Sequence, residues 1–244
     1  MIFDIHTHIG ENRFGDKPWT AETVLKIMDD WSIDRAILLP SISTGKYMSA
    51  QKLSEEVNKA PDRLVGFILV NPNDPNAVND LENAVVRYGA KGLKIHPAHM
   101  GVPADDEKRV YPLLEKAQEL KIPVMFHSGE TPYSTPWQVG LAALDFPKVT
   151  IIMEHMGFDS VALTDGAIKM AKKAENIILG TTGVIYDFPI TKAVQTIGSD
   201  RIVFGTETPI NHPMVEIQKI RVAKISEEDK EKILGKNIMR ILGL

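Results

Sequence analysis

The chain has 244 residues, of which 43% are hydrophobic and 25% are charged, so it can bury one large core and is neither disordered nor fibrous. Its formal net charge is −4 and its lysine and arginine residues are scattered, which argues against a nucleic acid as a partner. It contains no cysteine, so disulfides and thiolate metal sites are excluded and any metal ion must be bound by imidazole and carboxylate groups.

Long apolar runs are missing from the sequence, and none approaches the ~18 residues that a membrane-spanning helix needs. The first predicted strand begins at Ile2, and Asp4, His6 and His8 interrupt its apolar run, which is not typical of a secretory signal peptide. We therefore expect a soluble, cytoplasmic protein with no membrane partner.

Short apolar segments alternate with amphipathic helical patterns along the whole chain. Each apolar segment is nearly continuous and ends at a proline, a glycine or a polar residue, which is typical of a strand buried on both faces of a parallel sheet. We predict strands at 2–10, 35–40, 64–72, 91–97, 123–129, 149–157, 176–184 and 201–209. Helices are predicted at about 20–31, 49–59, 76–88, 111–120, 136–144, 160–174, 189–197, 216–224 and 226–242, with Thr20 and Ser226 as caps.

Eight strand–helix units in this length average about 30 residues each, which matches a compact (β/α)8 barrel. The first strand-to-helix turn has no Gly-x-Gly-x-x-Gly pattern and the chain has no P-loop, so an open doubly wound sheet is a weaker alternative. No composition break or Gly/Ser-rich linker divides the chain. We predict an α/β protein with a single TIM-type barrel domain over residues 1–244.

The first strand carries Asp4, His6 and His8 at spacings of two residues. Successive side chains on a strand point to opposite faces, so these three are expected on one face, with Phe3, Ile5 and Thr7 on the other. Two imidazoles on one face of one strand can hold one metal ion.

Further titratable residues fall where the other strands end, which is where barrel enzymes carry their working residues. His96, His127 and His155 each close an apolar strand, and Glu207 lies near the end of the last one. The steps of 31 residues from His96 to His127 and 28 from His127 to His155 are one strand–helix unit each.

A mononuclear metal site made by His6, His8, His127 and Glu207 would leave one position for an activated water. His155 suits a proton shuttle, because imidazole titrates near neutral pH. Lys94 and His96 are possible further metal or substrate contacts. An ordinary ion pair is the favoured explanation for Lys94, and a hydrogen bond near Pro97 explains His96 equally well. Arg13 is a candidate partner of a substrate carboxylate, against the simpler alternative of a solvated loop residue.

Motifs along the whole chain resemble the amidohydrolase superfamily, and within it the amidohydrolase-2 branch that is similar to aminocarboxymuconate-semialdehyde decarboxylase and related metal-dependent hydrolases. The matching segments are Asp4-x-His6-x-His8, 92–97, 122–129, 155–157, 204–209, 233–237 and 241–244. The resemblance implies that His6, His8 and His127 hold the metal, that the strand-eight acid completes the site, and that His155 acts on water or substrate.

The chain departs from this family at Glu207, where aspartate is usual, so we expect the carboxylate either to bind the metal differently or to act only as a base. Some relatives use a carboxylated lysine at the position of Lys94 to bridge two metals, so two ions per chain would follow if Lys94 were carboxylated.

These features predict a hydrolase, with zinc as the expected ion, that cleaves a small amide, ester or lactone through metal-activated water. One alternative is a metal-dependent, non-oxidative decarboxylase of a small unsaturated or aromatic acid. A second is a degenerate barrel with a binding role, suggested by Glu207. A nuclease similar to the TatD proteins also begins with Asp-x-His-x-His, but the acidic net charge disfavours it. The expected partner is a small-molecule substrate, and a homodimer stays open.

Overall fold

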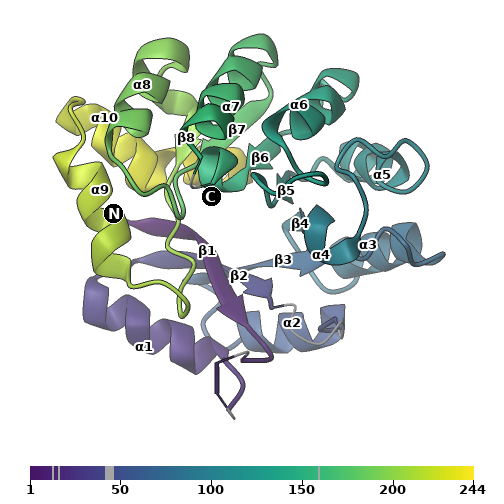
Figure 1. The fold of residues 1–244 in the computed structure, drawn as a ribbon. Coiled ribbons are helices and arrows are strands. Elements are labelled where there is room, and N and C mark those ends of the chain that lie inside the picture. Colours follow the sequence, from purple (N-terminus) through teal and green to yellow (C-terminus); the bar gives the residue numbers. More distant parts are fainter. Residues whose placement is uncertain (13, 16, 42–46, 159) are drawn as a thin grey trace.

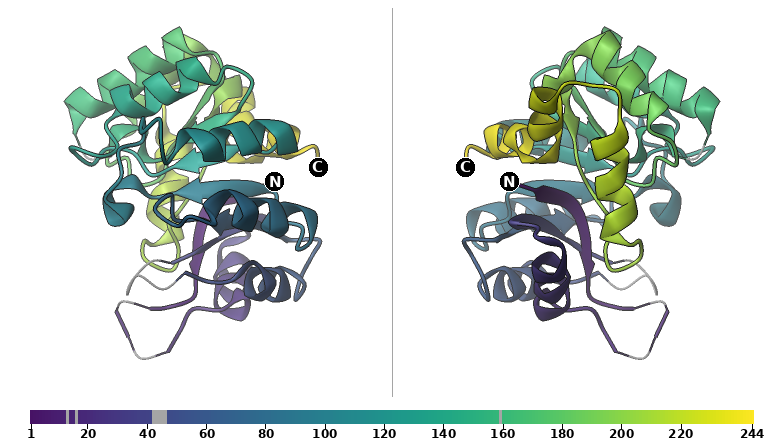
Figure 2. Two further views of the ribbon diagram at one scale, coloured as in Figure 1. Left: turned by 90° about the vertical axis from the view of Figure 1, so that its right-hand side faces the viewer. Right: turned by 90° about the vertical axis from the view of Figure 1, so that its left-hand side faces the viewer.

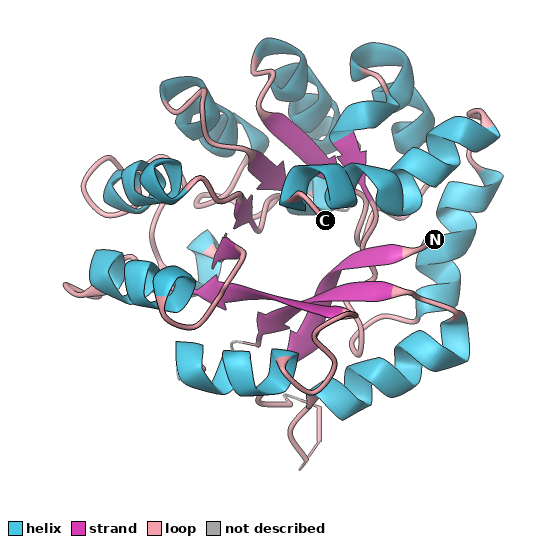
Figure 3. Ribbon diagram, turned by 180° about the vertical axis from the view of Figure 1, so that it is seen from behind, coloured by secondary structure: helices cyan, strands magenta, loops and turns pink. Residues whose placement is uncertain are grey.

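The structure is a computed structural model that describes residues 1–12, 14–15, 17–41, 47–158 and 160–244. In this part of the chain eight parallel strands follow one another in sequence order around a barrel, each paired with the next. Figures 1 and 3 show the strands enclosed by a ring of helices. The predicted (β/α)8 fold is thereby confirmed.

The strands are β1 (Phe3–Ile9), β2 (Arg35–Pro40), β3 (Leu64–Leu69), β4 (Gly92–Ile95), β5 (Val124–Phe126), β6 (Ile151–Met153), β7 (Ile177–Gly180) and β8 (Ile202–Val203). The helices are α1 (Ala21–Trp31), α2 (Ala50–Val57), α3 (Ala77–Val86), α4 (Pro97–Met100), α5 (Tyr111–Leu120), α6 (Pro136–Asp145), α7 (Val161–Lys173), α8 (Phe188–Ile197), α9 (Pro213–Val222), α10 (Glu227–Glu231) and α11 (Asn237–Leu242). Short 3₁₀ segments η1 (Glu154–Gly157) and η2 (Ser199–Arg201) and a π-helical segment η3 (Lys232–Lys236) complete the described elements.

Several predicted strands are longer than the observed ones at their carboxyl ends. The strand predicted at 149–157 ends at Met153, because the next four residues form η1, and the strand predicted at 201–209 is reduced to Ile202–Val203. Hydropathy does not separate a strand from a buried turn, and most of these extra residues are buried without belonging to a strand. The predicted caps at Thr20 and Ser226 are confirmed, each with a reciprocal capping box.

The last predicted helix, 226–242, is one helical stretch interrupted by the π-helical segment η3. The backbone amide of Phe204 donates a hydrogen bond of 3.0 Å to the carbonyl of Ile233, which draws that carbonyl toward the barrel. Gly235 lies against the start of β1, where an added Cβ would be 3.0 Å from the carbonyl oxygen of Met1. The C-terminal segment is therefore fitted to the end of the barrel at which the strands begin, and Figure 2 shows both termini at that end.

The barrel is closed between β1 and the residues that follow β8. The amide of Ile5 donates to the carbonyl of Phe204 at 3.0 Å, and the amide of His8 donates to that of Thr208 at 2.7 Å. Between these two bonds the amide of Glu207 donates to the carbonyl of His6 at 2.7 Å. Closure of the barrel therefore places Glu207 directly beside His6.

An irregularity in the register of β1 changes which side chains share a face. Asp4 pairs with Ala36 and Thr7 with Leu38, so one extra residue lies between the two pairs on β1. Such a bulge redirects side chains. The prediction that Asp4 shares one face with the two histidines was therefore wrong: His6 and His8 line the pocket, and Asp4 bonds to the segment after β8.

Two apolar layers hold the barrel together. The larger lies between the strands and the helices, and the smaller fills the interior of the barrel. The interior layer consists of Phe3, Ile5, Ile37, Leu39, Val65, Phe67, Met125, Ile152, Ile178, Val203 and Ile238. It is a packed core, so only the carboxyl end of the barrel is left for a site. Within the described ranges no helix is long and apolar enough to cross a membrane.

Candidate metal centre

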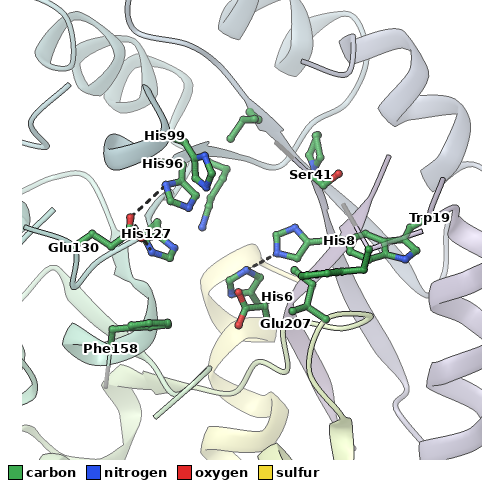
Figure 4. A pocket seen from close by; sticks show the side chains of 15 residues that line it. His6, His8, Trp19, Ser41, His96, His99, His127, Glu130, Phe158 and Glu207 are labelled. Atoms are coloured by element: carbon green, nitrogen blue, oxygen red, sulfur yellow. Dashed lines mark hydrogen bonds and ion pairs between the residues drawn. The ribbon is translucent and has the colours of Figure 1, made fainter. Parts of the chain in front are cut away.

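A pocket of about 170 Å³ opens at the carboxyl ends of the strands. Figure 4 shows histidine and glutamate side chains on two sides of it, with aromatic residues at its margin. The residues that line it are His6, His8, Phe14, Trp19, Pro40, Ser41, Leu69, Lys94, His96, His99, His127, Glu130, Phe158, Glu207 and Ile210.

His6, His8 and Glu207 converge on one side of this pocket. The Nε2 atoms of the two histidines are 3.0 Å apart, and the potential ligand atoms of all three residues lie within 4.8 Å of one another. Two nitrogens bound to one tetrahedral zinc ion at about 2.0–2.1 Å lie about 3.3 Å apart, so the pair needs little movement to share an ion. The structure thus brings together three of the four predicted ligands.

A left-handed backbone conformation at Glu207 helps its side chain to reach His6 and His8. Its φ is 65°, in the left-handed region that a residue with a side chain enters at a cost of about 1–3 kcal/mol. The turn is held by the His6 carbonyl and by the amide of Asn211, which donates to the Glu207 carbonyl at 3.2 Å. The Asn211 side chain also donates to the Glu207 carboxylate at 3.0 Å. The longer side chain of glutamate is therefore accommodated here by a constrained turn.

Asp4 ties the same turn to β1. Its carboxylate accepts hydrogen bonds from the amide and the hydroxyl of Thr206, the former at 2.9 Å, and from the amide of His6 at 2.9 Å. Burial raises the pKa of Asp4 to about 7, although these hydrogen bonds act in the opposite direction. The first acid of the motif therefore positions the site and does not line it.

Glu154 is a site residue that sequence reasoning missed. It is fully buried in η1, one carboxylate oxygen lies 3.3 Å from Nδ1 of His6, and the other contacts the ammonium group of Lys94. A carboxylate on Nδ1 favours the tautomer that leaves Nε2 of His6 unprotonated, which is the arrangement of metal-binding histidines in general. A glutamate inside the apolar segment before His155 was the signal that could have identified it.

His155 is fully buried and does not line the pocket. Its Nδ1 donates to the carbonyl of Thr182 at 3.0 Å, so its Nε2 must accept the hydrogen bond of 3.1 Å from Nδ1 of His127. His127 therefore carries its proton on Nδ1 and has an unprotonated Nε2. In this geometry His155 orients His127, and the predicted direct role of His155 on substrate finds no contact to support it.

His127 faces the side of the pocket opposite His6 and His8. Its Nε2 lies 3.5 Å from Glu130, and its ring stacks on that of His96 with centroids 3.8 Å apart. His96, His127 and Glu130 form a second group whose ligand atoms lie within 4.8 Å of one another. His127, the predicted fourth ligand, is therefore grouped with His96, which was predicted as a possible further contact, and with Glu130, which was not predicted.

Burial lowers the pKa of His6, His127 and His155 and so favours their neutral forms at physiological pH. Burial, followed by the nearby charge of Lys94, lowers the pKa of His6 well below its usual value and that of His155 to about 3. Burial and neighbouring imidazoles also lower the pKa of His127 well below its usual value. The pKa of Lys94 is itself lowered by burial, against the charges of Glu207 and Glu130. Neutral imidazole is the form that binds metals, so the site suits a divalent cation.

Two of the three remaining predicted contacts line the pocket. Lys94 and His96 line the pocket, whereas Arg13 lies outside the described residues. Lys94 contacts Glu154, so the ordinary ion-pair explanation holds for it.

A divalent ion fits this donor set on the evidence of the protein atoms. The buried Nε2 of His127 has no hydrogen-bond partner, and Nε2 of His6 lies 3.0 Å from Nε2 of His8. Together with Glu207 these groups are the nitrogen and oxygen donors that zinc, manganese and iron accept. The fold and the site define the class: barrel enzymes that bind a divalent metal at the carboxyl ends of their strands.

The chain belongs to the amidohydrolase family, whose amidohydrolase-2 model matches residues 47–244. This family match and its relatives confirm the resemblance found in the motifs and make the chain an enzyme of that superfamily. A γ-resorcylate decarboxylase of Polaromonas is 25% identical to it over 281 aligned residues, covering 90% of this chain and 86% of that protein.

Two solved structures share the fold. A dihydroxybenzoic acid decarboxylase of Polaromonas, with bound manganese and the inhibitor 2-nitroresorcinol, has a TM-score of 0.76 at 19% identity over 100% of this chain and 97% of that chain. A probable 2-pyrone-4,6-dicarboxylic acid hydrolase of Acinetobacter baumannii, with citric acid bound, has a TM-score of 0.76 at 15% identity over 100% of this chain and 99% of that chain. At these identities the structures establish the fold alone.

Proposed function

We propose that this enzyme is a metal-dependent, non-oxidative decarboxylase of a small aromatic or unsaturated acid. The observation that carries the proposal is its similarity to γ-resorcylate decarboxylase over nine-tenths of the chain. An aminocarboxymuconate-semialdehyde decarboxylase of Dictyostelium discoideum, 23% identical over 79% of this chain, supports the same chemistry. Our sequence-based first hypothesis, a hydrolase, becomes the second candidate.

The size and the lining of the pocket support a one-ring substrate. A cavity of about 150 Å³ encloses a benzene molecule, and the volume here is about 170 Å³. Leu69, Phe158 and Ile210 supply apolar surface for a flat ring, and the imidazoles and Lys94 supply polar groups for a carboxylate. Substrates much larger than one substituted ring would need the pocket to open.

Each group of the site has a place in this reaction, in which a carboxylate leaves as CO2 and one proton takes its position on carbon. His6, His8 and Glu207 would hold the ion, with His127 as the further predicted ligand. The ion, when bound, supplies positive charge that polarises the substrate's oxygen atoms. We assign proton transfer to the carboxyl group of Glu207, which lies beside His6 and His8. His155 and Glu154 hold His127 and His6 in the required tautomers.

The test is to supply metal-free protein with Mn²⁺ or Zn²⁺ and to incubate it with 2,6-dihydroxybenzoate, which a solved relative binds. We expect release of CO2 and, in D2O, one deuterium on the ring carbon of the product. Glu207→Gln should lower the rate by at least about 10²-fold, the usual contribution of a positioned acid–base group. Glu107→Gln, an exposed carboxamide substitution, is the matched control.

The second candidate, hydrolysis, uses the same site and is favoured by the fold shared with the probable 2-pyrone-4,6-dicarboxylic acid hydrolase. Ring opening of 2-pyrone-4,6-dicarboxylate, without CO2 from any aromatic acid, would support it over decarboxylation. The identity of the ion as zinc, the cytoplasmic location and a homodimer stay predictions. So does the bridging of two ions by a carboxylated Lys94, which the ion pair with Glu154 disfavours because a carbamate would repel that carboxylate.

A further inference from the structure

Phe158 lines two cavities of the molecule. One is the pocket of the candidate metal centre, and the other is a small cleft between the start of α7 and the loop from β7 to α8. Figure 4 shows the Phe158 ring on the same side of the metal pocket as His127 and Glu130. Phe158 is the one described residue that lines both cavities, so its side chain lies where they adjoin.

The cleft is apolar and nearly filled. Its volume is about 10 Å³, which is room for about one water molecule. Apart from Phe158, its lining includes Val161, Val184, Ile185, Tyr186 and Pro189. None of the described residues that line it is charged, and the side chains of Val161, Ile185 and Tyr186 are 52%, 61% and 53% exposed. The cleft therefore continues into apolar surface at the outside of the molecule.

The backbone holds Phe158 in place between the two cavities. Its φ is 61° and its ψ is −147°, a conformation that is almost restricted to glycine and that costs free energy at a residue with a side chain. The amide of Phe158 donates to the carbonyl of His155 at 2.7 Å. An added Cβ at Gly129 would lie 2.5 Å from the Cβ of Phe158, and one at Gly183 would lie 3.5 Å from its ring. A costly conformation that is kept by close neighbours indicates a function for this side chain.

We propose that Phe158 sets the upper size of the substrate, because its ring closes the metal pocket toward the apolar cleft and excludes acids with a large apolar substituent on that side. The inference rests on the proposed function, in which a one-ring acid occupies the pocket of about 170 Å³. Without the Phe158 ring the pocket and the cleft would join, and Val184 and Ile185 would offer apolar surface to such a substituent.

Loss of the Phe158 ring should leave the metal ligands in position. The ring contacts that of His155 edge-on, with centroids 5.0 Å apart, but His155 is fixed by its hydrogen bonds to Thr182 and His127. Phe158 is only partly buried and belongs to neither of the two apolar layers of the barrel. Phe158→Ala should therefore fold and bind zinc like the wild-type protein, which melting temperatures and elemental analysis would verify.

The test is a calorimetric titration of the Zn²⁺-loaded proteins with benzoate, 3-propylbenzoate and 4-propylbenzoate. The measured quantity is the affinity for each propyl acid relative to that for benzoate. In the wild-type protein this ratio should be about 0.1 or less for the isomer whose propyl group points at Phe158, since overpacking is costly. In Phe158→Ala it should rise to about 10, because each buried CH2 group contributes up to about fourfold in affinity.

Two further variants locate the effect. Phe14→Ala removes another aromatic ring that lines the metal pocket but not the cleft, so it should change the ratio by less than about threefold. Ile185→Ser, added to Phe158→Ala, should reverse the gain by about threefold or more, because Ile185 lines the cleft. Phe158→Leu keeps part of the apolar bulk and should give an intermediate ratio, and it carries the test if the alanine variant does not fold.

A rise of less than about tenfold for both isomers in Phe158→Ala would overturn the proposal. So would an equal rise in Phe14→Ala, or a gain that Ile185→Ser leaves unchanged. If the Zn²⁺-loaded wild-type protein bound none of these acids, the proposed function would fail and the role of Phe158 with it. If benzoate bound and the ratio did not change, only the role of Phe158 would fail, whereas absence of CO2 release with the expected ratios would contradict decarboxylation alone.

Discussion

Replacement of Glu154 by glutamine tests whether this buried carboxylate organises the metal centre. Glu154 is fully buried between His6 and Lys94, and the substitution removes its charge with little change of volume. Breaking a buried ion pair from one side costs about 3–5 kcal/mol. We expect the lower end of that range, because burial already lowers the pKa of Lys94 and the amine can lose its proton.

The expected loss is about 3 kcal/mol, or a decrease of the melting temperature by roughly 6–12 °C for a domain of this size. Urea unfolding of the metal-free protein measures it, with an unchanged m-value as the sign that the unfolded state is the same. Metal affinity should fall by about 10–100-fold, because His6 loses the acceptor that sets its tautomer.

A matched control exists elsewhere in the chain. Glu216 and Lys219 on α9 form another buried ion pair, with Nζ and Oε2 2.6 Å apart, and neither lines the pocket. Glu216→Gln should lower stability as well but leave metal affinity unchanged. If Glu154→Gln cost less than about 1 kcal/mol with normal metal binding, or if both variants weakened the metal equally, the assigned role of Glu154 would be wrong.

Three further outcomes are expected. Gly205→Ala should cost about 1–3 kcal/mol in urea unfolding, because an added Cβ would clash with the hydroxyl of Thr182. Glu56→Gln should cost about 1–3 kcal/mol at pH 7. Burial alone would raise the pKa of Glu56, but hydrogen bonds, first of all from Lys59, outweigh it and hold the pKa below its usual 4.5. The stability difference between the wild-type protein and Glu56→Gln should therefore be present above about pH 4.5 and disappear as the pH falls through the lowered pKa of Glu56. Removal of the metal by a chelator should lower the melting temperature by about 5–10 °C, as expected for an ion present at about 100 times its Kd; an unchanged melting temperature would contradict metal binding to the folded state.

Much of the fold follows from local features of the sequence. The segment 35–40 is a strand over the same residues that its apolar run and closing proline predict. Thr20 and Ser226 cap the helices that they precede. These features depend on near neighbours in the chain, so the sequence is sufficient to find them.

Only a part of the candidate site could be predicted from the sequence. The pair His6 and His8 and the strand-end position of His127 are visible in the sequence, because side-chain spacing on a strand and the length of a strand–helix unit are regular. The bulge in β1, which separates Asp4 from the histidines, is set by pairing with β2 and by closure against the residues after β8. No local pattern encodes it.

The sequence by itself therefore determined that the chain is a barrel with candidate metal-binding residues at one end, since repeating period and residue type are properties of the chain. Only the tertiary structure decided which of these residues meet. Glu154 contacts His6 and Lys94, and His127 faces Glu130, because strands distant in the sequence place their ends around one pocket and buried charges must find partners there.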